Sequence, residues 1–211
     1  TSQLAVLTND SQLINFLSEQ GVSFSDQDLH CATKLDLDKS VEALLRVEPQ
    51  IDINSNNENG FTPLFTAARD NYIEIVKKLI DAKADVNKAG NNNSTPLCIA
   101  AQNGHTKVVE KLIAAEADVN KADNTNLTPL WIAAQNGHTE VVEKLIAAEA
   151  DVNKAKNNNL TPIWIAAQNG HTEVVEKLIA AKADVNKAGN NNSTPLGIAA
   201  HIGHTEVVEK L

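Results

Sequence analysis

Apolar residues recur along most of this chain as short helical stripes, arranged in pairs and separated by polar, asparagine-rich segments. In residues 124–156 the first stripe runs from Leu130 to Asn136, and the second consists of Val141, Val142, Leu145 and Ile146. The second stripe has the spacing of one helix face, with charged residues on the opposite side. Helices this short are not stable alone in water. The pattern therefore predicts pairs of helices that depend on packing against neighbouring pairs.

The limits of the first helix are marked by residues that favour helix ends. Thr128 has the hydroxyl of a helix N-cap, and Pro129 suits the first helical position, where no backbone N–H is needed. Gly137 predicts a left-handed residue that ends the helix. Asn124–Leu127 has turn chemistry, because Asn tolerates left-handed backbone.

The second helix is predicted from Thr139, as its N-cap, to Ala148. Glu140 and Lys144 have the order and spacing of an ion pair within one helix. The following residues, Asp151–Asn153, are predicted to be an extended, strand-like segment that leads into the next turn. One unit is thus helix, loop, helix, hairpin.

The unit is repeated at an interval of 33 residues, with Thr-Pro-Leu or Thr-Pro-Ile beginning at Thr62, Thr95, Thr128, Thr161 and Thr194. Ala-Ala follows at a fixed offset in every copy, and Gly-His-Thr recurs in four of them. A period of this length predicts a stack of identical units, since no single unit can bury its apolar stripe. Small residues such as Ala133 and Ala134 would let neighbouring first helices approach closely.

The repeated motif is Thr-Pro-Leu-x-x-Ala-Ala-x-x-Gly-His-x-x-Val-Val-x-x-Leu-Ile followed by Ala-Asp-Val-Asn, and it resembles the ankyrin repeat. The resemblance is specific over residues 58–211 and weaker before them. It implies an all-α ankyrin-repeat α-solenoid of helix-loop-helix-hairpin units stacked into a curved array. It also implies that partners bind the concave wall and the hairpin tips.

Three departures from the family pattern are present. The His that follows Thr-Pro-Leu in the family is replaced by Phe65, Cys98, Trp131, Trp164 or Gly197. The Gly before Ala-Asp-Val-Asn is replaced by Lys or Glu, and the Gly two residues before Thr-Pro is replaced by Asn in four units. Asn accommodates a positive φ at modest cost, whereas Lys and Glu do so less comfortably.

We expect a single elongated domain of seven units. Residues 1–56 are predicted to be two divergent ankyrin-like repeats that cap the N-terminal end. Residues 57–211 are predicted to be five regular repeats, of which the last is truncated inside its second helix at Leu211. Because this last stripe is as apolar as the internal ones, we expect the chain to be a piece of a longer protein.

Composition narrows the classes of partner. The formal net charge of −9 argues against binding to nucleic acid or to anionic membranes, because both bind basic protein surfaces. No apolar run reaches membrane-spanning length, and the N-terminus lacks a signal-peptide layout. Cys31 and Cys98 are expected to be unpaired, as in a reducing compartment. N-glycosylation acceptor patterns at Asn92 and Asn191 would be decorated on a secretory route, so cytoplasmic residence is the simpler prediction.

No catalytic constellation is found in the sequence, which lacks a glycine-rich phosphate loop, a His-Glu-x-x-His motif and a paired-cysteine motif. His105, His138, His171 and His204 recur once per unit, and the period spreads them along the stack rather than around one metal ion. We expect them to have a structural role in the loops. The predictions are no enzyme, no cofactor and no metal site.

The positions that vary while the framework stays constant are the candidates for binding. Leu127, Trp131 and Gln135 are spaced i, i+4, i+8 and share one helix face, which predicts an exposed apolar patch on the concave wall. The alternative is that the two Trp residues fill the space of the missing His and pack between repeats. The predicted partner-binding residues are Phe61, Phe65, Arg69, Asp123, Leu127, Trp131, Gln135, Lys156, Leu160, Trp164, Gln168 and His201.

The function predicted from these observations is a monomeric protein–protein interaction scaffold that presents a preorganised surface. The alternative is that the array is the targeting arm of a larger protein, such as a bacterial host-directed effector whose enzymatic domain lies outside this chain. In that case the host cytosol is the expected location. A third possibility, self-association through the last, uncapped unit, would be an artefact of truncation.

Overall fold

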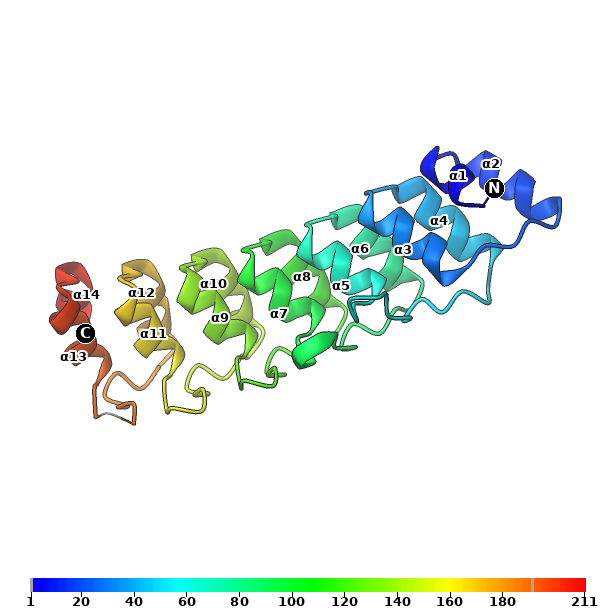
Figure 1. Cartoon of the computed structure of the whole chain (residues 1–211). Helices are drawn as coiled ribbons and strands as arrows, with labels where there is room; N and C mark the ends of the chain where they lie inside the picture. The colour runs from blue at the N-terminus through cyan, green and yellow to red at the C-terminus, as the bar shows by residue number, and fades with distance from the viewer. Residues whose placement is uncertain (1, 191) are drawn as a thin grey trace.

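The computed structural model describes residues 2–190 and 192–211, so the acceptor pattern at Asn191 lies outside the described residues. It contains fourteen α-helices in consecutive pairs, one short 3₁₀ helix and, within the described residues, no strand. The pairs stack side by side into one elongated array, with α1 and α2 at one end and α13 and α14 at the other (Figure 1). The all-α repeat architecture predicted from the 33-residue period is confirmed.

The helix bounds are α1 (Ser2–Leu7), α2 (Ser11–Glu19), α3 (Asp26–Lys34), α4 (Asp38–Val47), α5 (Pro63–Arg69), α6 (Ile73–Asp81), η1 (Asn91–Asn93), α7 (Pro96–Gln102), α8 (Thr106–Ala114), α9 (Pro129–Asn136), α10 (Thr139–Ala147), α11 (Pro162–Gln168), α12 (Thr172–Ala180), α13 (Pro195–Ile202) and α14 (Thr205–Lys210).

The first helix of each regular unit begins as the sequence predicts. The Thr128 hydroxyl accepts a hydrogen bond of 3.1 Å from the backbone N–H of Trp131, and Pro129 is the first helical residue. The same cap recurs at Thr62, Thr95, Thr161 and Thr194. Gly137 ends α9 with a φ of 74°. These boundaries are correct because they depend only on neighbouring residues.

Two local predictions are wrong. The N-cap of α10 is His138 and not Thr139, which is the first helical residue, and the helix ends at Ala147 with Ala148 as its C-cap. The segment Asp151–Asn153 is not strand-like but turns back, because the Asp151 carboxylate accepts a hydrogen bond of 2.9 Å from the backbone N–H of Asn153. Asp at this position closes its own turn.

The departures from family glycines are tolerated with the expected backbone. Asn126 and Asn159 have φ values of 61° and 57°, and Lys83 and Glu149 have φ values of 67° and 63°. Lys and Glu thus adopt the left-handed conformation after α6, α8, α10 and α12 despite its steric cost.

The hydrophobic core runs the length of the array between two layers of helices. First helices form one layer, where Ala133 and Ala134 are fully buried against neighbouring units. Second helices form the other layer and contribute apolar residues such as Val142 and Leu145. The loops between units gather along one edge of the array (Figure 1). The close approach of first helices predicted from the Ala-Ala pairs is confirmed.

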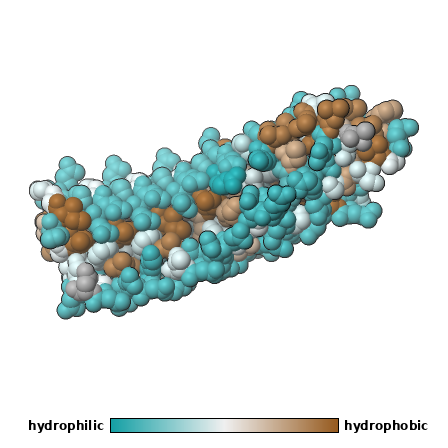
Figure 2. Space-filling model, in the orientation of Figure 1, coloured by the Kyte–Doolittle hydropathy of each residue, from teal (hydrophilic) through white to brown (hydrophobic). Residues whose placement is uncertain are grey.

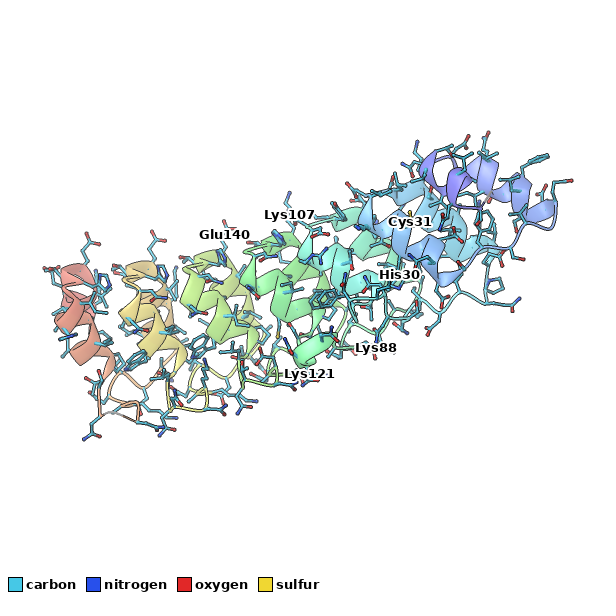
Figure 3. All side chains as sticks on the ribbon, viewed as in Figure 1. His30, Cys31, Lys88, Lys107, Lys121 and Glu140 are labelled. Atoms are coloured by element: carbon cyan, nitrogen blue, oxygen red, sulfur yellow. The ribbon has the colours of Figure 1, made fainter. Side chains whose placement is uncertain are left out.

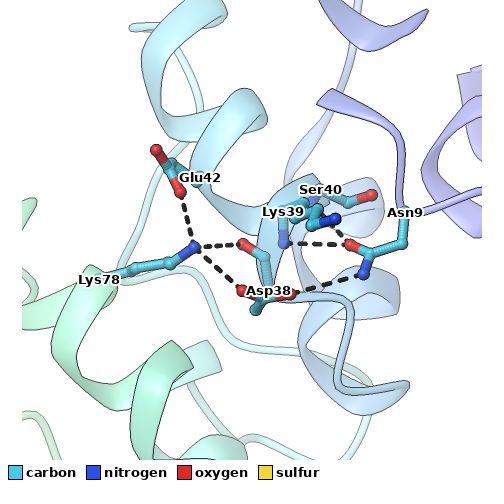
Figure 4. A network of polar contacts seen from close by, with 6 residues as sticks. All are labelled: Asn9, Asp38, Lys39, Ser40, Glu42 and Lys78. Carbon is cyan, nitrogen blue, oxygen red and sulfur yellow. Dashed lines mark hydrogen bonds and ion pairs between the residues drawn. The ribbon is translucent and has the colours of Figure 1, made fainter. Parts of the chain in front are cut away.

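The first two units are joined to the rest by polar contacts near the start of α4 (Figure 4). The Asn9 side-chain oxygen accepts hydrogen bonds of 3.0 Å from the backbone N–H groups of Lys39 and Ser40. On the other side, Lys78 Nζ lies 3.2 Å from an Asp38 carboxylate oxygen and 2.6 Å from a Glu42 carboxylate oxygen. Three successive units are thereby connected through α4.

Large apolar side chains are exposed mainly near the two ends of the array, where brown residues gather in Figure 2. At the N-terminal end Leu4 is 70% exposed and Phe16 is 56% exposed. At the C-terminal end Leu196 and Ile202 are exposed on α13. In the last stripe Val207 is buried, whereas Val208 and Leu211 are half-buried.

Candidate partner-binding surface

An aromatic cluster lies at the start of the regular array. Phe61, just before α5, stacks on Phe65 in its first turn, with ring centroids 4.5 Å apart and planes 4° from parallel. The Arg69 guanidinium lies 5.9 Å from the centre of the Phe61 ring and also pairs with Asp70 at 2.7 Å. Phe65 is buried, whereas Phe61 and Arg69 remain half-exposed. A cation over a stacked aromatic pair is therefore available on this first-helix surface.

Trp131 and Trp164 are buried, with only 3% and 5% of their surfaces exposed. The indole Nε1–H groups donate hydrogen bonds of 2.9 Å to the backbone carbonyls of Leu160 and Ser193, one unit further along the chain. The prediction of an exposed Trp patch is therefore wrong, and the packing alternative describes their placement. The spacing i, i+4, i+8 identifies a helix face correctly but does not reveal that the next hairpin covers it.

The other predicted residues of this region surround the buried indoles. Lys156 Nζ lies 5.3 Å from the centre of the Trp131 ring, and Leu127 and Leu160 are half-buried against the core. Gln135 is also half-buried. The surface that remains is thus polar and aliphatic, with the indole beneath it.

Asp123 has a structural contact that the sequence did not predict. Its carboxylate accepts hydrogen bonds of 2.7 Å from the backbone N–H of Thr125 and 3.0 Å from that of Leu127. This carboxylate therefore organises the hairpin tip rather than projecting freely. At the far end, Gln168 is half-buried and His201 is exposed.

The predicted structural role of the recurring His residues can be described in atomic detail. Nε2 of His138 lies 2.9 Å from the backbone carbonyl of Gln102 in the preceding unit, and His105, His171 and His204 make the equivalent bond. The imidazole ring lies directly over Gly104, where an added Cβ would be 2.7 Å from His138 Nδ1. His171 packs in the same way on Gly137 and His204 on Gly170, which accounts for the recurrence of Gly with His, whereas the equivalent position in the unit before His105 is taken by Asn71.

A second ladder joins the hairpin edges. The Asn120 side-chain oxygen accepts a hydrogen bond of 2.8 Å from the backbone N–H of Asp151, and the side-chain oxygens of Asn54, Asn87 and Asn153 accept the equivalent bond. Lys154 Nζ also donates to the Asn120 backbone carbonyl at 3.0 Å. The residues shared by all units are thus used to hold units together.

A family model described as ankyrin repeats in three copies matches residues 3–89, 84–156 and 130–211. The chain belongs to the ankyrin-repeat family. Ankyrin repeats generally mediate protein–protein interaction, and they are typically non-enzymatic modules. No curated protein matches this chain in a sequence comparison.

Other chemistry of this ankyrin-repeat chain is limited by burial and spacing. Cys31 and Cys98 are free, and burial raises the pKa of the Cys98 thiol, which keeps it protonated and weakly nucleophilic. Over the part of the chain that the structure describes, no group of three or more His, Cys, Asp or Glu side chains is placed to hold a metal ion. None of the described helices has the length and apolar character needed to cross a membrane.

Proposed function

We propose that this ankyrin-repeat array is a scaffold that binds a protein partner across its first-helix layer and hairpin tips. The proposal rests on one observation: the positions that are constant among units make the contacts between units, and the positions that vary remain at least partly exposed. The constant His, Asn and Thr residues form the contacts between units, as in the His138–Gln102 bond. The variable residues remain at least partly exposed on the first-helix side, and they are Phe61, Arg69, Leu127, Gln135, Lys156, Leu160, Gln168 and His201.

Rigidity favours this use. A surface held by repeated contacts between units loses little conformational entropy when a partner binds. The net charge of −9 favours a protein partner over nucleic acid. Free cysteines are consistent with a cytoplasmic, reducing environment, in which we expect the array to act as a monomer.

Site-specific photo-crosslinking tests the proposal. A benzophenone amino acid placed at Gln135 or Gln168 reports on the first-helix layer, and the same group at Glu143 or Glu176 reports on the second-helix layer. In extracts of the source cells, the first pair should yield a discrete cross-linked protein and the second pair should not. Cross-links from the second-helix positions alone, or from none of the four, would contradict the proposal.

Charge reversal of the partly exposed cations gives a second measurement. Arg69→Glu with Lys156→Glu should weaken capture of that cross-linked protein by about tenfold, as expected for lost complementary charges. Lys182→Glu is the matched control, because this exposed position carries Glu116 or Glu149 in other units.

A further inference from the structure

Neighbouring second helices are joined by a ladder of lysine–glutamate ion pairs. In each pair, a Lys of one second helix meets a Glu of the preceding one, and the Lys Nζ to carboxylate distance is 2.5–2.6 Å. The pairs are Lys78–Glu42, Lys144–Glu110, Lys177–Glu143 and Lys210–Glu176. The pairing of Glu140 with Lys144 within α10 that the sequence suggests is wrong, because Lys144 bonds across to α8.

Among the described helices from α4 to α14, the ladder is interrupted at one interface, between α6 and α8. Lys77 occupies the Glu position on α6, so it stands opposite Lys111 on α8, and neither lysine has an ion pair among the described residues. Lys107, in the first turn of α8, replaces the Glu that α10, α12 and α14 carry at that position. Figure 3 shows Lys107 and its counterpart Glu140 at the same edge of consecutive units.

The same interface contains an open groove with an apolar floor. Its volume is about 530 Å³, and Ile73, Ile80 and Ala114 lie along it together with the three lysines. Ile73 stands where the following units have Thr, while Asp81 stands where they have Ala. Lys77 and Lys107 replace Glu residues of those units, so the groove is more basic than its counterparts. Of the two carboxylates that line it, Glu110 is paired with Lys144 at 2.6 Å, and Asp81 lies at one end.

We propose that the α6–α8 groove binds an acidic amphipathic helix of a protein partner. The apolar face of that helix would cover Ile73 and Ile80, and its carboxylates would pair with Lys77, Lys107 and Lys111. Charge complementarity favours an acidic peptide, because three lysines line this groove although the net charge of the chain is −9. The apolar floor favours a peptide over nucleic acid, whose phosphates would gain nothing from Ile73.

This surface lies on the second-helix layer and is separate from the surface in the proposed function. The array would therefore hold two protein segments at once, one on each layer. Failure of either proposal leaves the other unchanged, since the residues that test them do not overlap.

The test uses a fluorescein-labelled synthetic helix of about 16 residues with Leu on one face and Glu on the other. Binding to the whole chain is followed by fluorescence anisotropy. The wild-type chain should bind this peptide, and a matched peptide with Gln in place of Glu should bind at least about tenfold more weakly because the lysines lose their charge partners. A labelled single-stranded DNA of similar charge should bind more weakly than the acidic peptide.

The repeats themselves supply the variants. Lys77→Glu recreates the Glu110–Lys144 arrangement, Lys107→Glu recreates Glu140, and Ile73→Thr recreates Thr106. Each should keep the wild-type circular dichroism and lower the peptide affinity, by about tenfold or more for the charge reversals. Lys182→Glu changes the net charge equally and should leave the affinity unchanged.

Several results would overturn the proposal. They are an absence of peptide binding, equal binding of the Glu and Gln peptides, DNA binding as tight as that of the peptide, and equal losses in Lys77→Glu and Lys182→Glu. If Lys77→Glu alters the fold, Lys107→Glu and Ile73→Thr decide the question, because they change other positions of the groove.

Discussion

The indole Nε1–H of Trp131 donates a hydrogen bond of 2.9 Å to the backbone carbonyl of Leu160, which lies just before the first helix of the next unit. Trp164 makes the same bond to Ser193. At the equivalent position, the Cys98 thiol lies 3.6 Å from the Lys121 carbonyl. This position therefore joins successive units where it is Trp, whereas the smaller Cys98 side chain contacts a carbonyl within its own unit.

Tryptophan fluorescence tests this placement directly. The two Trp residues, 3% and 5% exposed, should emit at short wavelength and resist quenching by iodide. Trp164→Phe leaves Trp131 as the single reporter, and Trp131→Phe isolates Trp164. Red-shifted emission with ready quenching in either variant would show that the indole is open to solvent.

The same residues should contribute to stability. Trp131→Phe loses one hydrogen bond to a backbone carbonyl and should lower the free energy of unfolding by about 1 kcal/mol. Trp131→Ala also leaves a cavity and should cost about 3–5 kcal/mol. Urea denaturation followed by circular dichroism measures both, and an Ala variant as stable as the wild type would contradict interfacial packing.

The sequence predicts what depends on neighbouring residues and misses what depends on the adjoining unit. Thr128 and Gly137 identify the ends of α9 because capping is local. The sequence predicts an exposed Trp131 because the spacing identifies its helix face, whereas the hairpin that covers this face cannot be predicted from spacing. For the same reason the sequence suggests a pair between Lys144 and Glu140 within one helix, although the partner of Lys144 is Glu110, one unit away.

The groove between α6 and α8 was missed for a related reason. Comparison of the units along the first helices and hairpins identifies variable positions there, but Lys77 and Lys111 lie on the second helices. Within its own unit Lys77 is an exposed lysine and Lys111 a half-buried one, and neither is unusual there. Their significance emerges only when the ladder of Glu–Lys pairs on either side is known.

Gly104 should be intolerant of a side chain for two separable reasons. Its φ is +72°, and an added Cβ would meet the imidazole of His138 at 2.7 Å. Gly203 has a φ of +96° with nothing within 4 Å of an added Cβ, so Gly203→Ala carries the backbone strain alone. Gly203→Ala should cost about 1–2 kcal/mol, and Gly104→Ala should cost about 1–3 kcal/mol more because His138 is displaced. Equal urea midpoints for the two variants would exclude a role for the His138 contact.

Lys78 should stabilise the N-terminal units in a pH-dependent way. Partial burial raises the pKa of Asp38, but hydrogen bonds from Lys78 and Asn9 outweigh it and leave the pKa below 3.8. The hydrogen bond from Lys78, together with its charge, also lowers the pKa of Glu42. A carboxylate whose pKa is lower in the folded state than in the unfolded state stabilises the fold at pH values above its pKa in the unfolded state. This stabilisation is lost as the pH falls through its pKa in the folded state.

Lys78→Met should therefore lower the free energy of unfolding at pH 7 by about 1 kcal/mol, a value reduced by the partial exposure of the pair. The difference from wild type should shrink as the pH falls below 3.8 through the lowered pKa values and both carboxylates become protonated. Lys177→Met, which breaks the more exposed pair with Glu143, is the control and should have a smaller effect. A Lys78→Met deficit that is independent of pH would mean that the lysine acts through packing alone.

His30 should make the fold less stable in mildly acidic solution. Its side chain is buried on α3, with Nε2 3.2 Å from the Ser55 hydroxyl. Burial lowers the pKa of His30 below 6.5, and the contact with Ser55 and the charge of Asp26 only partly offset this. The unfolded state then binds the proton more tightly, so the contribution of His30 to stability is complete above about pH 6.5 and falls as the pH drops below it.

The variant His30→Gln cannot titrate at this position and should flatten the dependence of the unfolding free energy on pH between about pH 7 and pH 5. His201→Gln, at an exposed position, should retain the wild-type slope, and the same slope in His30→Gln would show that another group titrates in this range.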